Sequence, residues 1–242
     1  MILTDAAFLA APGFRSRAYA QSMVQADLLP ALVLELPGEE PVWEGPGEVR
    51  VDLGGPGGEM IFRPDEPTRI TLAAAGVPID DIPTADINTP QVAAIIAGIE
   101  ADVVIYSGLG GVLLKPPLLN CDKRFLHVHG GYAPAYRGST AFYYSLLAEG
   151  SIGATALWLE PGIDAGPIIL RRNIRPPRGI EIDRVLDPLA RARVLTEVLA
   201  TRGRTGSFPE GTRDSAGAET YHVIHPVLKH LALRRCGLVR SQ

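Results

Sequence analysis

Residues 125–139 read Phe-Leu-His-Val-His-Gly-Gly-Tyr-Ala-Pro-Ala-Tyr-Arg-Gly-Ser, and residues 161–167 read Pro-Gly-Ile-Asp-Ala-Gly-Pro. The first stretch begins as a short apolar strand. Because a strand directs alternate residues to the same face, His127 and His129 are expected to project together. The glycines that follow, and Asp164 between two glycines, are typical of loops at strand ends. The two stretches therefore predict an acid–base site at the edge of a sheet.

The segments around this centre alternate between strand and helix. Apolar runs predict strands at residues 2–10, 31–36, 77–82, 102–106, 125–129, 154–159 and 167–170. Helical spacing predicts helices at 16–26, 64–76, 90–99, 139–149 and 183–201, with Thr89 and Ser139 as N-caps and Pro188 as a kink. The alternation predicts an α/β, doubly wound and mainly parallel sheet. The short gap between the last two strands predicts an antiparallel pair and hence a mixed sheet.

The division of the chain follows from the same pattern. Residues 1–178 are expected to form the catalytic domain, and residues 179–242 a short C-terminal helical extension that packs on the body. Residues 37–58, which are rich in Gly, Pro and Glu, predict a loop or a small hairpin excursion. Residues 203–220 predict a surface loop, and the apolar tail at 221–233 is expected to pack back on the body.

Composition excludes several classes of protein. The 242 residues are 46% hydrophobic, which is too apolar for disorder, and the net charge of −4 argues against an extended nucleic-acid surface. No run approaches 18 apolar residues, so no membrane span is expected. The N-terminus lacks a basic leader region, which favours a cytoplasmic protein. Cys121 and Cys236 form no disulfide framework or zinc pattern and are expected to be reduced.

The residues by themselves leave several readings of the site open. His129 is suited to metal-free acid–base chemistry, because the pKa of histidine lies near neutral pH. A metal held by His127, His129 and Asp164 is a second reading, although no metal-binding motif supports it. Two structural histidines beside a solvated turn aspartate are a third. The stretch from Ser107 to Gly111 follows a buried strand, and it is equally a ligand-binding edge and a tight turn.

The order of four elements adds a resemblance to a known family. These elements are the strand ending at His129, the loop Pro134-Ala-Tyr-Arg-Gly138, the helix ending at Gly150, and Gly162-Ile-Asp-Ala-Gly-Pro-Ile168. Together they resemble the folate-dependent formyltransferases, which include methionyl-tRNA, glycinamide ribonucleotide and sugar-amine N-formyltransferases. The similarity runs from about residue 102 to residue 169. It implies a Rossmann-like domain that transfers a formyl group from 10-formyltetrahydrofolate to an amine.

The resemblance also implies roles for particular residues. His129 matches the catalytic histidine of the family, which polarises the formyl group, and Asp164 matches the aspartate that orients the histidine and accepts protons. His127 stands where the family has a catalytic asparagine, and it is expected to be the second donor to the oxyanion. The implied cofactor-binding residues are Tyr106, Ser107, Gly108, Leu109, Gly110, Gly111, Gly130, Gly131 and Ile163. The implied substrate-binding residues are Tyr132, Tyr136, Arg137 and Gly138.

The acceptor is expected to be a small-molecule amine of the amino-sugar or amino-acid type. The tRNA-formylating members of the family carry a separate basic C-terminal domain, and about 70 residues after the core are too few for one. No nucleic acid, membrane or metal is expected as a partner, and the chain is compatible with a homodimer. The loop at 37–63 and the tail are the expected acceptor-side elements. Hydrolysis of formyltetrahydrofolate, and folate or metabolite binding without catalysis, remain alternatives because His127 replaces the asparagine.

Overall fold

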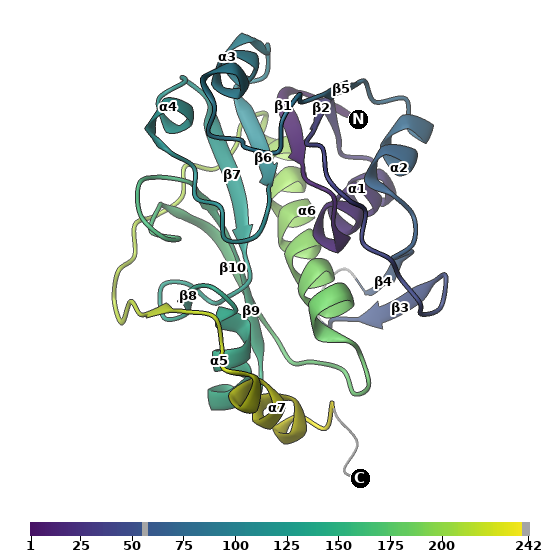
Figure 1. The fold of residues 1–242 in the computed structure, drawn as a ribbon, viewed down its shortest axis with the longest axis vertical. Coiled ribbons are helices and arrows are strands. Elements are labelled where there is room, and N and C mark those ends of the chain that lie inside the picture. The colour runs from purple at the N-terminus through teal and green to yellow at the C-terminus, as the bar shows by residue number, and fades with distance from the viewer. Residues whose placement is uncertain (55–57, 239–242) are drawn as a thin grey trace.

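A seven-stranded sheet forms the centre of the computed structural model, which describes residues 1–54 and 58–238. Its order is β10-β9-β7-β6-β1-β2-β5. The strands are β1 (Ile2–Ala10), β2 (Leu29–Glu35), β5 (Ile79–Asp81), β6 (Val103–Ser107), β7 (Arg124–His129), β9 (Ile152–Trp158) and β10 (Ile168–Ile174). The first five run parallel, whereas β9 is antiparallel to both β7 and β10. The mixed α/β sheet predicted from the sequence is confirmed (Figure 1).

Helices cover both faces of the sheet, because alternate residues of each strand bury to opposite sides. The larger core lies between the sheet and the helices α1 (Phe14–Gln25) and α6 (Asp187–Thr205), with Phe8, Ile105 and Leu126 pointing into it. The smaller core lies under α3 (Pro90–Gly98) and α4 (Pro116–Leu119), and it receives Leu9 and Val104. Tyr106 buries on this second side, immediately before β6 ends.

The remaining elements lie at the ends of the sheet. A hairpin of β3 (Val49–Asp52) and β4 (Glu59–Phe62) confirms the predicted excursion, although residues 55–57 of its glycine-rich turn lie outside the described residues. The other elements are α2 (Thr68–Ala74), β8 (Arg137–Gly138), α5 (Ala141–Glu149), a π-helix (Ile182–Leu186), β11 (Thr220–Tyr221) and α7 (Pro226–Arg235). Within the described part of the chain, no helix is long and apolar enough to span a membrane.

Two details of the helices differ from the sequence prediction. Ser139 does not cap α5: the N-cap is Thr140, whose hydroxyl instead accepts a hydrogen bond from the backbone of Ile224 at 2.9 Å. Pro188 lies in the first turn of α6, directly after the π-helix at Ile182–Leu186, so a change of helix type stands at the position of the predicted kink. The predicted cap at Thr89 is confirmed by its contact with Val92 N at 3.3 Å.

The proposed division at residue 178 stays a prediction, and the structure adds one fact to it. Helix α6, which the sequence places in the extension, packs against α1, β7, β9 and β10. Its apolar face, including Leu189 and Val198, belongs to the larger core. Helix α7 packs instead on α5, at the lower end of the molecule in Figure 1.

Candidate functional site

His129 and Asp164 meet at the carboxyl end of β7. The Nδ1 atom of His129 lies 3.2 Å from Oδ2 of Asp164, and both side chains are largely buried. Asp164 comes from the turn between β9 and β10, where its φ of 48° places it in the left-handed region that Asp tolerates better than most residues. Gly166 permits this turn, because a Cβ there would collide with the carbonyl of Trp158. Two residues distant in sequence are thus held in direct contact.

The site loop, residues 132–140, fixes both members of this pair. The carbonyl oxygen of Tyr136 lies 2.8 Å from Nε2 of His129, and the backbone N–H of Gly138 donates to Oδ2 of Asp164 at 3.0 Å. Gly131 makes the first contact feasible, since a Cβ at this position would collide with both the Tyr136 oxygen and His129 Nε2. The loop therefore holds the pair through main-chain atoms.

Both ring nitrogens of His129 face acceptors, and this constrains its protonation. Because a carbonyl oxygen can only accept, Nε2 carries the proton that it donates to Tyr136. The contact between Nδ1 and Oδ2 of Asp164 is then a hydrogen bond only if one of these two atoms carries a further proton. Burial lowers the pKa of His129, although the Asp164 carboxylate opposes that shift. Burial would raise the pKa of Asp164, but His129, His127 and the Gly138 amide outweigh it and hold that pKa below its usual value. The lowered pKa values oppose this extra proton, whereas the approach of Nδ1 to Oδ2 at 3.2 Å favours a proton shared between the two atoms.

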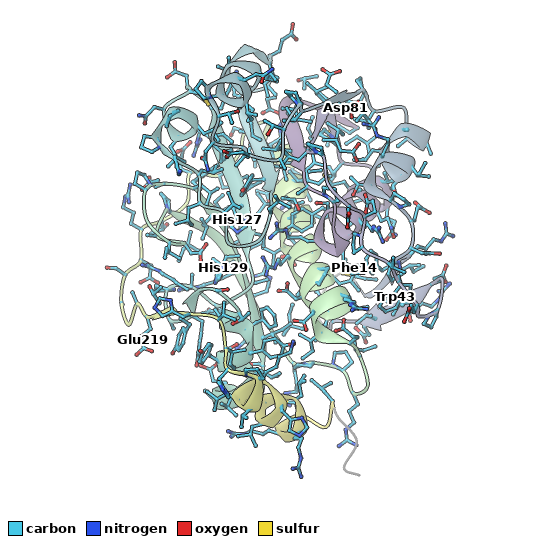
Figure 2. The ribbon with its side chains drawn as sticks, in the orientation of Figure 1. Phe14, Trp43, Asp81, His127, His129 and Glu219 are labelled. Atoms are coloured by element: carbon cyan, nitrogen blue, oxygen red, sulfur yellow. The ribbon has the colours of Figure 1, made fainter. Side chains whose placement is uncertain are left out.

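His127 lies two residues earlier on β7, close to His129 along the strand (Figure 2). Its Nδ1 atom is 3.4 Å from the carbonyl oxygen of Tyr106, and its ring centroid is 5.8 Å from that of Tyr106. Burial, followed by the positive charge of Arg15, lowers the pKa of His127 to about 3. His127 is consequently a neutral imidazole at pH 7, whereas His129 is bound to a carboxylate.

Two arginines approach the site from helices, and sequence reasoning missed both. The Nε atom of Arg15 on α1 donates to Ser107 Oγ at 3.0 Å, and its Nη2 donates to the carbonyl of Gly108. Arg191 on α6 forms a bidentate pair with Asp187, at 2.9 and 2.8 Å, beside Gly130. The only sequence signal for Arg191 was its i,i+4 spacing from Asp187, and this spacing is equally typical of an ordinary surface ion pair.

Arg15 differs from its neighbours in its charge balance. Arg17 is paired with Glu40 at 2.5 Å, and Arg191 with Asp187. Within residues 1–54 and 58–238, Arg15 has no carboxylate within ion-pair distance, and its recorded hydrogen bonds go to neutral oxygens. A half-buried cation without a counter-ion favours negative charge nearby. Arg15 therefore gives the end of β6 a positive potential.

The predicted cofactor-binding stretch lies next to these groups. The Tyr106 ring covers Gly108 so closely that a Cβ on residue 108 would collide with the phenol. The Tyr106 hydroxyl is buried and has no hydrogen-bond partner in the described part of the chain. Leu109, in the same stretch, and Ile163, in the turn that carries Asp164, are apolar side chains that remain 38% and 39% exposed. A buried hydroxyl without a partner and exposed apolar side chains in these two loops are features that a flat heterocycle with polar edges would fit.

The predicted substrate residues have a structural part in the site. Arg171 lies over the ring of Tyr132 at 4.9 Å, and Arg137 Nη2 donates to the carbonyl of Asp214 at 3.1 Å. The Tyr136 hydroxyl donates to Glu149 at 2.7 Å, and Gly138 binds Asp164. Each of these residues contacts the protein's own groups and shapes the site loop. No group of three potential metal ligands occurs among the residues that the structure describes.

Comparisons with known proteins show which proteins the chain is similar to. The model of the formyl transferase family matches residues 71–179. A methionyl-tRNA formyltransferase of Chloroflexus aggregans is 28% identical over 141 residues, which cover 57% of this chain and 45% of that protein. The chain thus spans about half the length of this curated relative.

Solved structures extend the likeness beyond the matched segment. A sugar N-formyltransferase from a Shewanella species superposes with a TM-score of 0.58 at 13% identity, covering 96% of this chain and 87% of that one. HypX from Aquifex aeolicus in complex with tetrahydrofolic acid gives 0.55 at 15% identity, covering 93% of this chain and 30% of that one. At these identities the likeness shows the fold. The resemblance seen in the sequence is confirmed: residues 71–179 match the formyl transferase family model, and a solved sugar N-formyltransferase shares the fold of the chain.

Proposed function

We propose that the protein transfers a formyl group from 10-formyltetrahydrofolate to the amine of a small molecule. The observation that carries this proposal is the contact of His129 with Asp164 at 3.2 Å, beside His127 and the loop that follows β6. The family match and the tetrahydrofolate bound to HypX support the choice of cofactor. The cofactor would be held by the stretch from Tyr106 to Gly111 and by Ile163, where exposed apolar side chains adjoin a buried hydroxyl without a partner.

The reaction needs a donor for the charge that builds on the formyl oxygen, and we assign this role to His127. Both nitrogens of His129 are bound within the protein, whereas among the described residues Nε2 of His127 has no recorded partner. The 3.4 Å contact of Nδ1 with the Tyr106 carbonyl is long for an N–H···O bond, and donation to the oxyanion requires the tautomer that carries its proton on Nε2. A neutral imidazole can act as an electrophile when its pKa is lowered, as it does in triosephosphate isomerase.

The pair of His129 and Asp164 is assigned to proton transfer. As the new bond forms between the amine nitrogen and the formyl carbon, the amine loses a proton and the bond from that carbon to the cofactor nitrogen breaks. The Oδ1 atom of Asp164 has no recorded partner among the described residues and can accept the amine proton. The shared proton on the pair then supplies the departing nitrogen. Arg15 adds positive charge that favours the developing oxyanion.

The acceptor is proposed to be a small amine, because a net charge of −4 disfavours a polyanion. The competing acceptor is an aminoacyl-tRNA, since the curated relative is a methionyl-tRNA formyltransferase. The loop at 37–63 and the C-terminal tail are the proposed acceptor-side elements, and Trp43 already packs edge-to-face on Phe14 at 5.9 Å (Figure 2). We also propose a cytoplasmic location, consistent with two free cysteines. A homodimer stays a prediction.

Tetrahydrofolate release from the purified chain tests the proposal. The chain is incubated with 10-formyltetrahydrofolate and, separately, with amino sugars, amino acids and methionyl-tRNA. Release that depends on a small amine, and that falls by about 10² to 10³ in His127→Ala, supports the proposal. Release without any amine would identify a hydrolase instead. Folate binding without release under any condition, unchanged in His129→Ala, would identify a non-catalytic binder.

A further inference from the structure

The C-terminal strap, residues 212–224, runs along the second half of the site loop. Backbone hydrogen bonds join them, among them Glu219 N to Pro134 O at 3.2 Å, Arg137 N to Glu219 O at 3.0 Å, and Ser139 N to Tyr221 O at 3.0 Å. Figure 1 shows this segment passing β8 before it reaches α7, and Figure 2 places Glu219 on it. A segment that begins at residue 212, 38 residues after the last strand of the central sheet ends at Ile174, thus pairs with the loop at the site.

Along the site loop, residues that bind the strap alternate with residues that bind His129 and Asp164. Tyr136 O holds His129, and Gly138 N holds Asp164. The strap binds residues 137 and 139, on either side of Gly138, and residue 134 before Tyr136. The first half of the loop has other supports, because Thr155 accepts from Ala133 N and Arg171 donates to Ala133 O. The half of the loop that touches Asp164 is therefore held mainly by the strap.

Tyr221 is the central contact of the strap. Its ring stacks on Tyr136 with centroids 5.5 Å apart and an interplanar angle of 18°, and it also packs on Tyr144 at 4.4 Å. Its carbonyl lies so close to Gly138 that a Cβ there would collide with it. Gly138 has a φ of 90°, a conformation that favours glycine, so the chain is adapted to this approach. Removing the ring leaves the backbone pairing without its side-chain support.

We propose that Tyr221 is a positioning residue for formyl transfer, which fixes the site loop and thereby the contact of His129 with Asp164. The inference rests on the proposed function for its kinetic consequence. The physical reason is that the loop contributes only main-chain groups to the pair, so a shift of the loop moves both hydrogen bonds together. A displacement of about 1 Å at a reacting group lowers the rate by about 10²-fold. The ring acts through Tyr136 and Gly138 and does not touch the reactants.

The test uses the full chain with Tyr221→Ala, the conservative Tyr221→Phe, and a matched control, Ser215→Ala. Ser215 also lies on the strap, it is exposed, and its side chain makes no hydrogen bond with the described residues. The alanine variant is expected to lose about tenfold or more in kcat, with a KM for 10-formyltetrahydrofolate within about twofold of the parent. The phenylalanine variant keeps the stacked ring and is expected to retain activity, as is Ser215→Ala. Tyr221→Leu replaces Tyr221→Ala if that variant does not fold.

A second measurement separates this inference from the proposed function. The Nε2 proton of His129 is buried and bonded to Tyr136 O, so it is expected to exchange slowly in ¹H–¹⁵N spectra. Its exchange should become faster in Tyr221→Ala and stay slow in the other two variants. If the parent transfers no formyl group, the proposed function fails and the exchange rates still decide the role of Tyr221. Unchanged exchange and kcat in Tyr221→Ala, or equal losses in Tyr221→Phe, would overturn the inference.

Discussion

Gly131→Ala is the most direct probe of the site, because the two atoms nearest to the added methyl are those of the contact that fixes His129. A Cβ at residue 131 would collide with Tyr136 O and His129 Nε2, and it would lie 3.1 Å from the Cβ of Ala141. Gly131 has no positive φ, so alanine can adopt its backbone conformation without strain. The effect is therefore steric and local. The methyl must displace the imidazole or the carbonyl, and either movement breaks their 2.8 Å hydrogen bond.

The size of the effect follows from two contributions. Inserting a methylene-sized group into a packed interior costs about 1–3 kcal/mol. Leaving a buried donor and acceptor unpaired costs a comparable amount of about 1–3 kcal/mol, and relaxation that relieves one also relieves the other. We expect the free energy of unfolding to fall by about 2–3 kcal/mol in total. The shift of His129 is expected to lower kcat by about 10²-fold.

Urea unfolding and formyl-transfer kinetics measure these two quantities. The matched control is Gly98→Ala, at the end of α3, where a Cβ meets nothing within 4 Å. This change is expected to leave kcat unchanged and to alter stability by less than about 1 kcal/mol. If Gly131→Ala retains both the parent's kcat and its slowly exchanging His129 proton, the collision described above does not govern the site, and the reasoning is refuted.

Three further predictions concern the charged groups of the site. His127→Asn supplies a neutral amide donor and should retain most of the activity that His127→Ala loses, as initial rates will show. Arg15→Met should raise the pKa of His127, because the charge of Arg15 helps to lower that pKa, and it should also reduce kcat. A ¹⁵N titration of the His127 ring that shows no upward shift of the pKa would contradict this prediction. Because the pKa of His127 is lowered to about 3 in the folded chain, the unfolded chain binds this proton first as the pH falls below about 6.5. The contribution of a neutral His127 to stability is therefore complete above pH 6.5 and declines toward pH 3. As the pH falls over this range, the free energy of unfolding should decrease less steeply in His127→Asn than in the parent. Equal slopes in the two proteins would refute the prediction.

The sequence determined the fold class and the centre of the site. The apolar runs and the helical spacing are local properties, so they predicted the α/β sheet, the helix start at Thr89 and the antiparallel strands that flank Asp164. The motif from His127 to Gly138 and the distant Asp164 pointed to the formyl transferase family before any contact was known. The apolar run predicted the strand that carries both His127 and His129, and the two-residue period of a strand predicted that they project to the same face.

Only the tertiary structure decided how these residues are held and what surrounds them. The lack of a local pattern concealed Arg15, whose guanidinium reaches Ser107 across 92 residues, and the strap, which returns to the site loop about 80 residues after it. The tertiary structure also revealed that His129 binds both Asp164 and the Tyr136 carbonyl. His127 is then the imidazole of the site with a nitrogen that has no partner among the described residues. Local propensity carries no information on such contacts, because they depend on how elements distant in sequence pack around the sheet.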